Sequence, residues 1–241
     1  MAGASNIVAA GVLAIGVAAA GFLAGEALIK SRLGFRTVTV KGLSEREVKA
    51  DLGFWPVRFV ANGANLEDAR LRLEASENAV KAFLARQGFE TGDYQVQNIL
   101  VEDRFAGYNA QQTPEQFRFV LTEDMLVRSQ DVQKLAQAAR NMGDLLKAGV
   151  VFSSDSYNAG PSFIFTGIAN LKGEMLSEAT QRAREAAQKF AEESGAEVGD
   201  IQSANQGVFE ISPAVEIPND RPEKQTDKKV RVVTTITYFL E

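Results

Sequence analysis

The pattern of hydrophobic and polar positions changes abruptly near the start of the chain. Residues 1–25 contain no charged side chain, and residues 7–29 are apolar apart from Glu26 and the small residues among them. A helix of about 20 apolar residues spans the roughly 30 Å hydrocarbon core of a bilayer. The run is longer than the apolar core of a signal peptide and has no basic start. We therefore expect an uncleaved transmembrane anchor over residues 1–30, in contact with lipid through residues 7–29.

Two features of this segment bear on its packing and its orientation. Gly21 and Gly25 form a Gly-x-x-x-Gly pair, and small residues on one helix face favour helix association in lipid. The alternative is that Gly and Ala are simply frequent in such segments. Lys30, Arg32 and Arg36 follow the segment, and the positive-inside tendency would keep the downstream chain in the cytoplasm.

Beyond the anchor, alternating apolar positions predict strands at both ends of the chain. Residues 37–40 are β-branched throughout, which is typical of a strand. Apolar residues occupy even positions over 48–52 and odd positions over 55–61. A change of face within one strand needs an extra residue, so we expect a bulge near residues 54–56 and Pro56 at a sheet edge. The last strand, residues 230–240, places four apolar side chains on one face: Val232, Ile236, Tyr238 and Leu240.

Three segments instead repeat apolar residues at the three-to-four spacing of a helix. They cover residues 66–87, 130–147 and 172–194. Asn65 and Ser129 are expected to cap the first two, and a glycine follows each of the three segments. The predicted inward faces are Leu66, Ala69, Leu73, Val80, Phe83 and Leu84; Val132, Leu135, Ala139, Met142 and Leu146; and Leu176, Ala179, Ala183, Ala186 and Phe190.

An internal repeat organises these elements. Residues 88–95 and 195–202 match at a constant offset of 107, which also pairs Asn98 with Asn205 and Val101 with Val208. Each copy is expected to contain a helix, a glycine stop, a Gly-Asp turn and a strand. We infer an α+β fold over residues 36–241. It consists of two β-α-β-β halves, about 36–128 and 150–241, linked by a middle helix over 130–147.

Two long segments lie at corresponding places in the halves, residues 105–114 and 212–228. Long loops inside a compact domain are usually functional or disordered. Phe105 and Tyr108 in the first segment, with Val215 and Ile217 in the second, are candidate anchors for a partner chain. The alternative is that both are surface loops with a few stray apolar residues.

The composition limits the kinds of catalytic and binding site that the chain can form. The chain has no histidine and no cysteine, which excludes nucleophile systems and zinc sites built on those residues. Its net charge of −5 argues against nucleic-acid binding, because phosphate contacts need a basic face. Glu90 with Asp93, and their copies Glu197 with Asp200, could form catalytic pairs, but an Asp in a Gly-Asp pair usually caps a turn. We expect no enzyme activity, catalytic residue, metal or cofactor.

The motifs also resemble a known family. The opening TVTVKGLSEREVKADL of residues 37–52, the Gly-Asp turns, residues 128–135 and the alanine-rich third helix are similar to the SIMPL-domain family of bacterial envelope proteins. The resemblance spans about residues 36–240. One departure is that many members have a Pro-Asp pair where this chain has Ala50 before Asp51, which leaves the conformation of that turn open.

The resemblance implies a periplasmic or membrane-anchored protein with no established reaction, linked to envelope and oxidative stress and able to form ring- or channel-like homo-oligomers. We therefore expect a single-pass inner-membrane protein whose soluble domain faces the periplasm, against the weak orientation signal of the basic residues. Its expected function is a self-assembling envelope scaffold, ring- or cage-like. The alternative is a periplasmic binding or adaptor module for an envelope protein or a small ligand.

Overall fold

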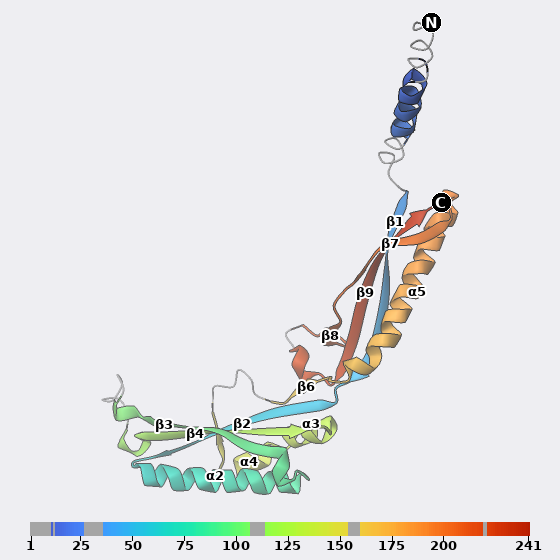
Figure 1. The fold of residues 1–241 in the computed structure, drawn as a ribbon. Helices are drawn as coiled ribbons and strands as arrows, with labels where there is room; N and C mark the ends of the chain where they lie inside the picture. The colour runs from blue at the N-terminus through green and yellow to red at the C-terminus, as the bar shows by residue number, and fades with distance from the viewer. Residues whose placement is uncertain (1–10, 12, 27–35, 107–113, 154–159, 219–220) are drawn as a thin grey trace. The chain divides into compact units, whose positions relative to one another are not determined.

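The structure is a computed structural model that describes residues 11, 13–26, 36–106, 114–153, 160–218 and 221–241 (Figure 1). Helices and strands are mixed and form two separate sheets, which confirms the α+β class. The chain divides into two compact units. The terminal unit comprises Met1–Leu43, Ser177–Gly207 and Val233–Glu241, and the central unit comprises Ser44–Leu176 and Val208–Val232.

A three-strand path forms the first sheet, most of which lies in the terminal unit, in the order β1 (Thr37–Lys49), β9 (Asp227–Leu240) and β7 (Val198–Gln206). Helix α5 (Ile168–Ser194) runs along it (Figure 1). Alternate side chains of β9 are buried, as its pattern predicts. The chain end is held in the sheet, because Leu240 N donates to Arg36 O at 2.8 Å. The buried side chains of β9 are Lys228, Val230, Val232, Thr234, Ile236 and Tyr238, while Leu240, predicted on the same face, is half-buried.

The inward face of α5 differs from the prediction. A row at i, i+4 spacing is buried, and it consists of Met175, Ala179, Ala183, Ala187 and Ala191. Phe190, predicted inside, is 62% exposed, and Leu176 is only half-buried. The physical reason is close approach: a Cβ added to Gly42 of β1 would lie 1.7 Å from Ala179 O. Only small residues fit where the helix packs so tightly against β1, at Ala179 and Ala183.

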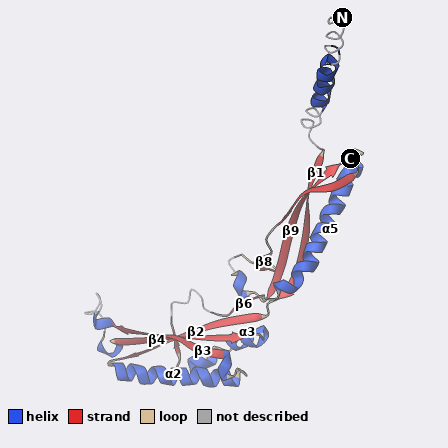
Figure 2. Cartoon of the chain, viewed as in Figure 1, coloured by secondary structure: helices blue, strands red, loops and turns tan. Residues whose placement is uncertain are grey.

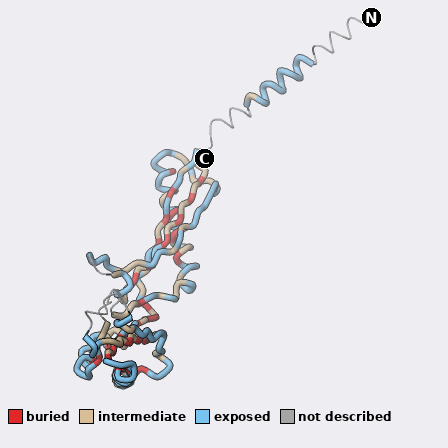
Figure 3. Tube along the Cα trace, turned by 90° about the vertical axis from the view of Figure 1, so that its left-hand side faces the viewer, coloured by how far each residue is buried: buried red, intermediate tan, exposed pale blue. Residues whose placement is uncertain are grey.

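The sheet of the central unit has the order β3 (Tyr94–Asp103), β4 (Phe119–Ser129), β2 (Leu52–Gly63) and β5 (Val151–Phe152), and β6 (Ser162–Ile164) also pairs with β2. Helices α2 (Leu66–Arg86), α3 (Val132–Arg140) and α4 (Gly143–Lys147) cover one face (Figure 2). Trp55, Phe59, Phe83, Leu135 and Leu145 form the centre of this core, each at most 1% exposed. Figure 3 shows the buried residues gathered along these strands and helices.

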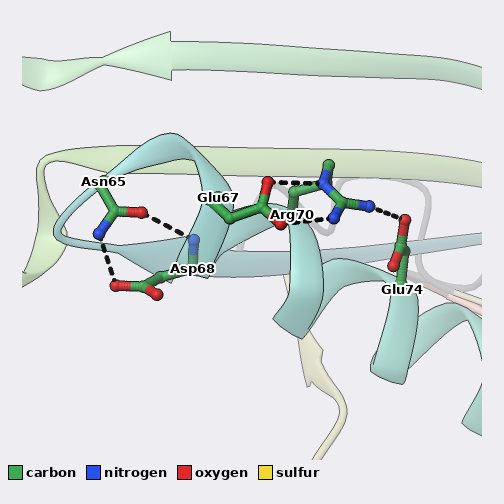
Figure 4. Close-up of polar contacts among 5 residues, drawn as sticks. All are labelled: Asn65, Glu67, Asp68, Arg70 and Glu74. Atoms are coloured by element: carbon green, nitrogen blue, oxygen red, sulfur yellow. Dashed lines mark hydrogen bonds and ion pairs between the residues drawn. The ribbon is translucent and has the colours of Figure 1, made fainter.

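Helix α2 begins and ends where the sequence predicts. Asn65 caps it, with Oδ1 accepting from Asp68 N at 2.9 Å (Figure 4). Gly88 ends it with φ of 84°, a left-handed conformation that glycine adopts without strain. Five of the six predicted inward residues are buried. The exception is Leu66, the first residue of the helix, which is 48% exposed.

The middle helix is two helices rather than one. The chain leaves helical geometry between Arg140 and Gly143, so α3 and α4 replace the expected continuous helix over 130–147. Asp131 rather than Ser129 caps α3, because its side chain accepts from Lys134 N. The break shifts the buried face, so that Leu145 is 1% exposed and Leu146, predicted inside, is 59% exposed.

The predicted bulge near residues 54–56 is wrong. Strands β2 and β4 pair without a register shift from Gly53 to Gly63. Most of the even-numbered set is separated from the odd-numbered set by a break between β1 and β2 at residues 50–51, and only Leu52 of the even-numbered set lies in β2. Pro56 lies in the middle of β2 rather than in an edge strand. On the side away from β4, β6 pairs with residues 52–54 and β5 with residues 59–60, so among the described residues Pro56 has no strand partner on that side.

The repeat has a structural counterpart that does not follow the order of the chain. Both α2 and α5 end at a glycine with positive φ, Gly88 and Gly195. Each leads to an edge strand, β3 or β7, that pairs with a longer strand, β4 or β9. The sheets β2-β4-β3 and β1-β9-β7 therefore correspond. The second motif takes its first strand from β1, so the two units do not coincide with the expected halves 36–128 and 150–241.

The long segment over 212–228 also has more structure than expected. It contains the end of β8 (Glu210–Pro213), which pairs with β9, and a 3-10 helix, η6 (Pro222–Lys224). Lys228 is 5% exposed, its Nζ donates to Pro222 O at 2.6 Å, and burial lowers its pKa. Ala50 N donates to Thr226 O at 2.7 Å. The second half of this segment is thus part of the folded unit.

In the described part of the chain, no helix has both the length and the apolar character needed to span a membrane. The expected span of residues 7–29 is described only at residue 11 and over 13–26. The described residues therefore do not support the predicted transmembrane helix, and its remaining positions lie outside them.

Candidate functional site

The outer edge of β3 is an exposed apolar strand edge. β3 ends the strand order of its sheet, so in the described residues no strand pairs with its outer side. Strands whose edges are unpaired present free backbone donors and acceptors to other chains. Here the edge also exposes aliphatic side chains: Val96 is 41%, Ile99 51%, Leu100 59% and Val101 51% exposed.

A bulge decides which way these side chains face. The register of β3 on β4 shifts between Val96 and Asn98, so Gln97 is an extra residue. Beyond it, Ile99 pairs with Glu123 and Val101 with Leu121, while Val96 pairs with Met125. Directly opposite residues of paired strands point to the same face. Since Leu121, Glu123 and Met125 are all buried, the bulge places Val96, Ile99 and Val101 on the core side of the sheet, where they are nevertheless half exposed.

The strand next to this edge contains a buried acid. Glu123 is 1% exposed, between Phe59 of β2 and Ile99 of β3, and its Oε1 has no hydrogen-bond partner. Burial, with a contribution from the negative charge of Glu77, raises the pKa of Glu123 to about 7. Lys81, which pairs with Glu77 at 2.5 Å on α2, opposes the shift. A buried carboxyl without a partner favours its neutral form.

The equivalent edge strand of the terminal unit, β7, is also exposed. β7 ends its own strand order, and Ile201 is 52% exposed. Its register on β9 places Ile201, Ala204 and Gln206 on the face of the buried residues Tyr238, Ile236 and Thr234. This row is less apolar than that of β3, because it contains one large aliphatic residue rather than three.

The described candidate partner residues follow strands of different sheets. Phe105, 37% exposed, follows β3 in the 3-10 helix η2 (Arg104–Ala106), and Arg118 lies 5.1 Å from the centre of its ring. Arg118 also donates to both carboxylate oxygens of Asp103, at 3.1 and 3.0 Å. Phe105 is therefore held by its own hairpin. Tyr108 lies outside the described residues.

Val215 and Ile217 follow β8 and extend into solvent, 64% and 52% exposed. The two candidate glycines, Gly21 and Gly25, lie in the described part of the amino-terminal helix, where an added Cβ would have open space around it. Large apolar side chains of that helix are exposed as well, among them Leu13, Ile15, Val17, Phe22 and Leu23.

Of the acidic residues considered as catalytic pairs, Glu90 and Asp93 have a structural role. Glu90 and Asp93 form a capping box around the 3-10 helix η1 (Thr91–Asp93), with Glu90 N donating to Asp93 Oδ2 at 2.9 Å. In the second copy, Glu197 and Glu241 exchange two backbone hydrogen bonds of 3.0 Å. Within the described residues, no group of three or more acidic side chains is placed to hold a metal ion.

Sequence reasoning did not assign a role to Asp51. Its Oδ1 accepts from Thr166 N at 2.8 Å and its Oδ2 from Gly167 N at 3.0 Å. Both amides directly precede α5, whose first residue is Ile168. Asp51 therefore fixes the backbone at the start of α5. It does so here with Ala50 before it, where many members of the similar family have a proline.

Comparison with known proteins agrees with this reading of the motifs. The family SIMPL, described as "Protein of unknown function (DUF541)", matches residues 38–238, which is most of the chain and contains both sheets. The chain belongs to the SIMPL family. No curated protein matches this SIMPL chain. Among solved structures, it is similar to an uncharacterized conserved protein from Listeria innocua, at 14% identity and a TM-score of 0.18, over 78% of this chain and 91% of that one.

Proposed function

We propose that this SIMPL protein is a non-catalytic envelope scaffold that assembles with copies of itself into a large, ring- or cage-like homo-oligomer. The observation that carries the proposal is that two of the sheet edges, β3 and β7, expose aliphatic side chains on the core face of their sheets. A monomer that exposes such edges is prone to pair with other chains. Two edges per chain provide the two contact surfaces that an assembly larger than a dimer needs.

The proposal includes attachment to the bacterial inner membrane through residues 7–29, with the folded units in the periplasm. Support comes from the charge-free sequence and from the exposure of Leu13, Phe22 and Leu23 on the amino-terminal helix. Gathering many such helices side by side would bring Gly21 and Gly25 into helix–helix contact. The same scaffold would support the envelope under oxidative stress.

The mass of the full chain in mild detergent, compared with a variant lacking residues 1–29, tests self-assembly. We expect a large and discrete particle for both, because the edge strands lie outside the deleted segment. A large particle formed only by the full chain would mean that the amino-terminal segment, rather than the edge strands, mediates self-assembly. Monomers of both at micromolar concentration would contradict the scaffold.

A second candidate is a binding or adaptor module for an envelope protein or a small ligand. The favouring observation is the exposure of Val215 and Ile217 beyond β8. Deleting the whole segment would also remove Thr226, whose carbonyl accepts from Ala50 N, so the variant V215S/I217S is the cleaner test. Loss of a co-purifying envelope protein, with the particle mass unchanged, would favour this function. Unchanged capture would contradict it.

A further inference from the structure

The outer edge of β3 has the pattern of a surface that pairs with itself. Because of the bulge, Val96 and Gln97 together take up one position along the strand. A two-fold axis through Ile99 then places Ile99 opposite its own copy. The same antiparallel register sets Val96 opposite Val101 of the second copy. All three lie on the core face and are 41–51% exposed. Each aliphatic side chain of the row thus meets another aliphatic side chain across the axis.

Charge at the two ends of β3 suits the same arrangement. Asp93, the last residue of the 3-10 helix η1, directly precedes β3, and Arg104, the first residue of η2, directly follows it. Antiparallel pairing about the two-fold axis places the end of β3 next to Asp93 beside the end of the other copy next to Arg104. Opposite charges at the facing ends favour this antiparallel arrangement.

We propose that β3 pairs antiparallel with β3 of a second copy of this chain, about a two-fold axis at Ile99, to form one continuous sheet across the two molecules. This inference rests on the proposed self-assembly and names one of its interfaces. Backbone groups along the outer edge of β3 supply the inter-strand hydrogen bonds, as in other cases of strand addition. In the pair, the side chains of Val96, Ile99 and Val101 are covered on the core side of the sheet, where they are half exposed in a single molecule.

The choice of β3 over β7 follows from their side chains. The corresponding row of β7 is Ile201, Ala204 and Gln206, so self-pairing there would bury one large aliphatic residue and a polar amide. An isologous contact also uses the same patch twice, which a self-complementary row provides. β7 and its neighbours remain available for a second type of contact.

Substitution of the central residue tests the interface in the full chain. Ile99→Lys places two positive charges directly opposite each other on the axis, so the mass of the particle in mild detergent should fall at least about two-fold. Leu71→Lys is the matched control, because Leu71 is also 51% exposed but lies in helix α2 rather than in an edge strand. It should retain the wild-type mass. Unaltered fluorescence of Trp55, the single tryptophan, verifies that the central unit of each variant is folded.

Cross-linking tests the register directly, because the chain has no cysteine of its own. Directly opposite residues of antiparallel strands have Cα atoms about 4.5–5.5 Å apart, within the range that a disulfide spans. Under mild oxidation Ile99→Cys should form a covalent dimer in most of the protein, and Ile201→Cys should not. A dimer formed only between Ile99→Cys and Ile201→Cys chains would overturn the two-fold pairing in favour of a β3–β7 contact.

The outcomes separate this inference from the proposed function. If the wild-type chain is oligomeric, and Ile99→Lys keeps its mass while Ile99→Cys stays uncross-linked, the β3 interface is wrong and assembly uses another surface. If the wild-type chain is monomeric, the scaffold itself fails, and the interface with it.

Discussion

Glu123 is a carboxylic acid in the hydrophobic interior of the central unit, and it carries the clearest prediction at the scale of single residues. Its pKa in the folded chain is about 7, above its ordinary 4.5. Between these values the folded state binds more protons than the unfolded state, so the free energy of unfolding falls as pH rises from about 4.5 to 7. The full loss is roughly 3 kcal/mol above pH 7.

Glu123→Gln should remove most of this pH dependence, because the amide stays neutral. We expect the free energy of unfolding of the variant to change little between pH 5 and pH 8, while that of the wild type drops by roughly 3 kcal/mol. Trp55 fluorescence during urea unfolding measures both. Glu102→Gln, at an exposed position of β3, should behave as the wild type. Equal pH slopes for Glu123→Gln and wild type would contradict the assignment.

Gly42 shows how one residue determines the packing of a helix. Its missing side chain allows Ala179 O to approach within 1.7 Å of where a Cβ would lie, and Ala183 N within 2.7 Å. Backbone atoms cannot move aside as a flexible side chain can. Gly42→Ala should therefore lower the free energy of unfolding by about 3 kcal/mol or more.

The change is measured by far-ultraviolet circular dichroism during thermal unfolding. Gly173→Ala is the control, because an added Cβ at this position of α5 has open space. Alanine in a helix interior should stabilise by about 0.5–1 kcal/mol relative to glycine. If both variants unfold at the same temperature as the wild type, β1 and α5 do not pack as described.

At the scale of elements, α2 begins with a network of polar contacts, shown in Figure 4. Asn65→Ala removes the acceptor for Asp68 N and should cost about 1 kcal/mol of stability, measured by Trp55 fluorescence. Asn65→Ser should restore most of it. Arg70 pairs with Glu67 and Glu74 on the exposed surface, so Arg70→Ala should cost less stability than Asn65→Ala. A larger loss for Arg70→Ala than for Asn65→Ala would reverse this ranking.

Helices α2, α3 and α5 were predictable to different degrees. α2 followed from its cap, its glycine stop and its apolar spacing, because these signals are local. The break between α3 and α4 was missed, since the apolar spacing continues across it. The inward face of α5 was partly wrong, because a row of alanines carries little hydrophobic signal beside Leu176 and Phe190. Packing against Gly42, a residue far away in the sequence, selects the small side chains.

At the scale of the whole molecule, the proposed orientation makes the folded units accessible from the periplasm. A single cysteine introduced at Glu192, an exposed position of α5, should react with a membrane-impermeant maleimide in intact spheroplasts. The natural chain, which has no cysteine, is the blank. Labelling only after lysis would place the units in the cytoplasm, as the basic residues after the apolar segment would suggest.

The sequence by itself determined what depends on neighbours along the chain. Alternation in β2 and β9, the cap at Asn65 and the stops at Gly88 and Gly195 all follow from local chemistry, and the motifs were sufficient for the family. The repeat was visible as well, because its glycines and turn residues must recur wherever the local backbone recurs.

Only the tertiary structure decided how distant segments pair. In the structure, β1 belongs to the second motif, and residues 50–51 interrupt the strand between β1 and β2. Val96, Ile99 and Val101 are exposed on the core face of an edge strand. The tertiary structure also buried Glu123 opposite Ile99, although a charged residue in an alternating strand gives no sign of its depth. These features depend on which strand lies beside which and on where a covering helix stops, and no local pattern encodes either.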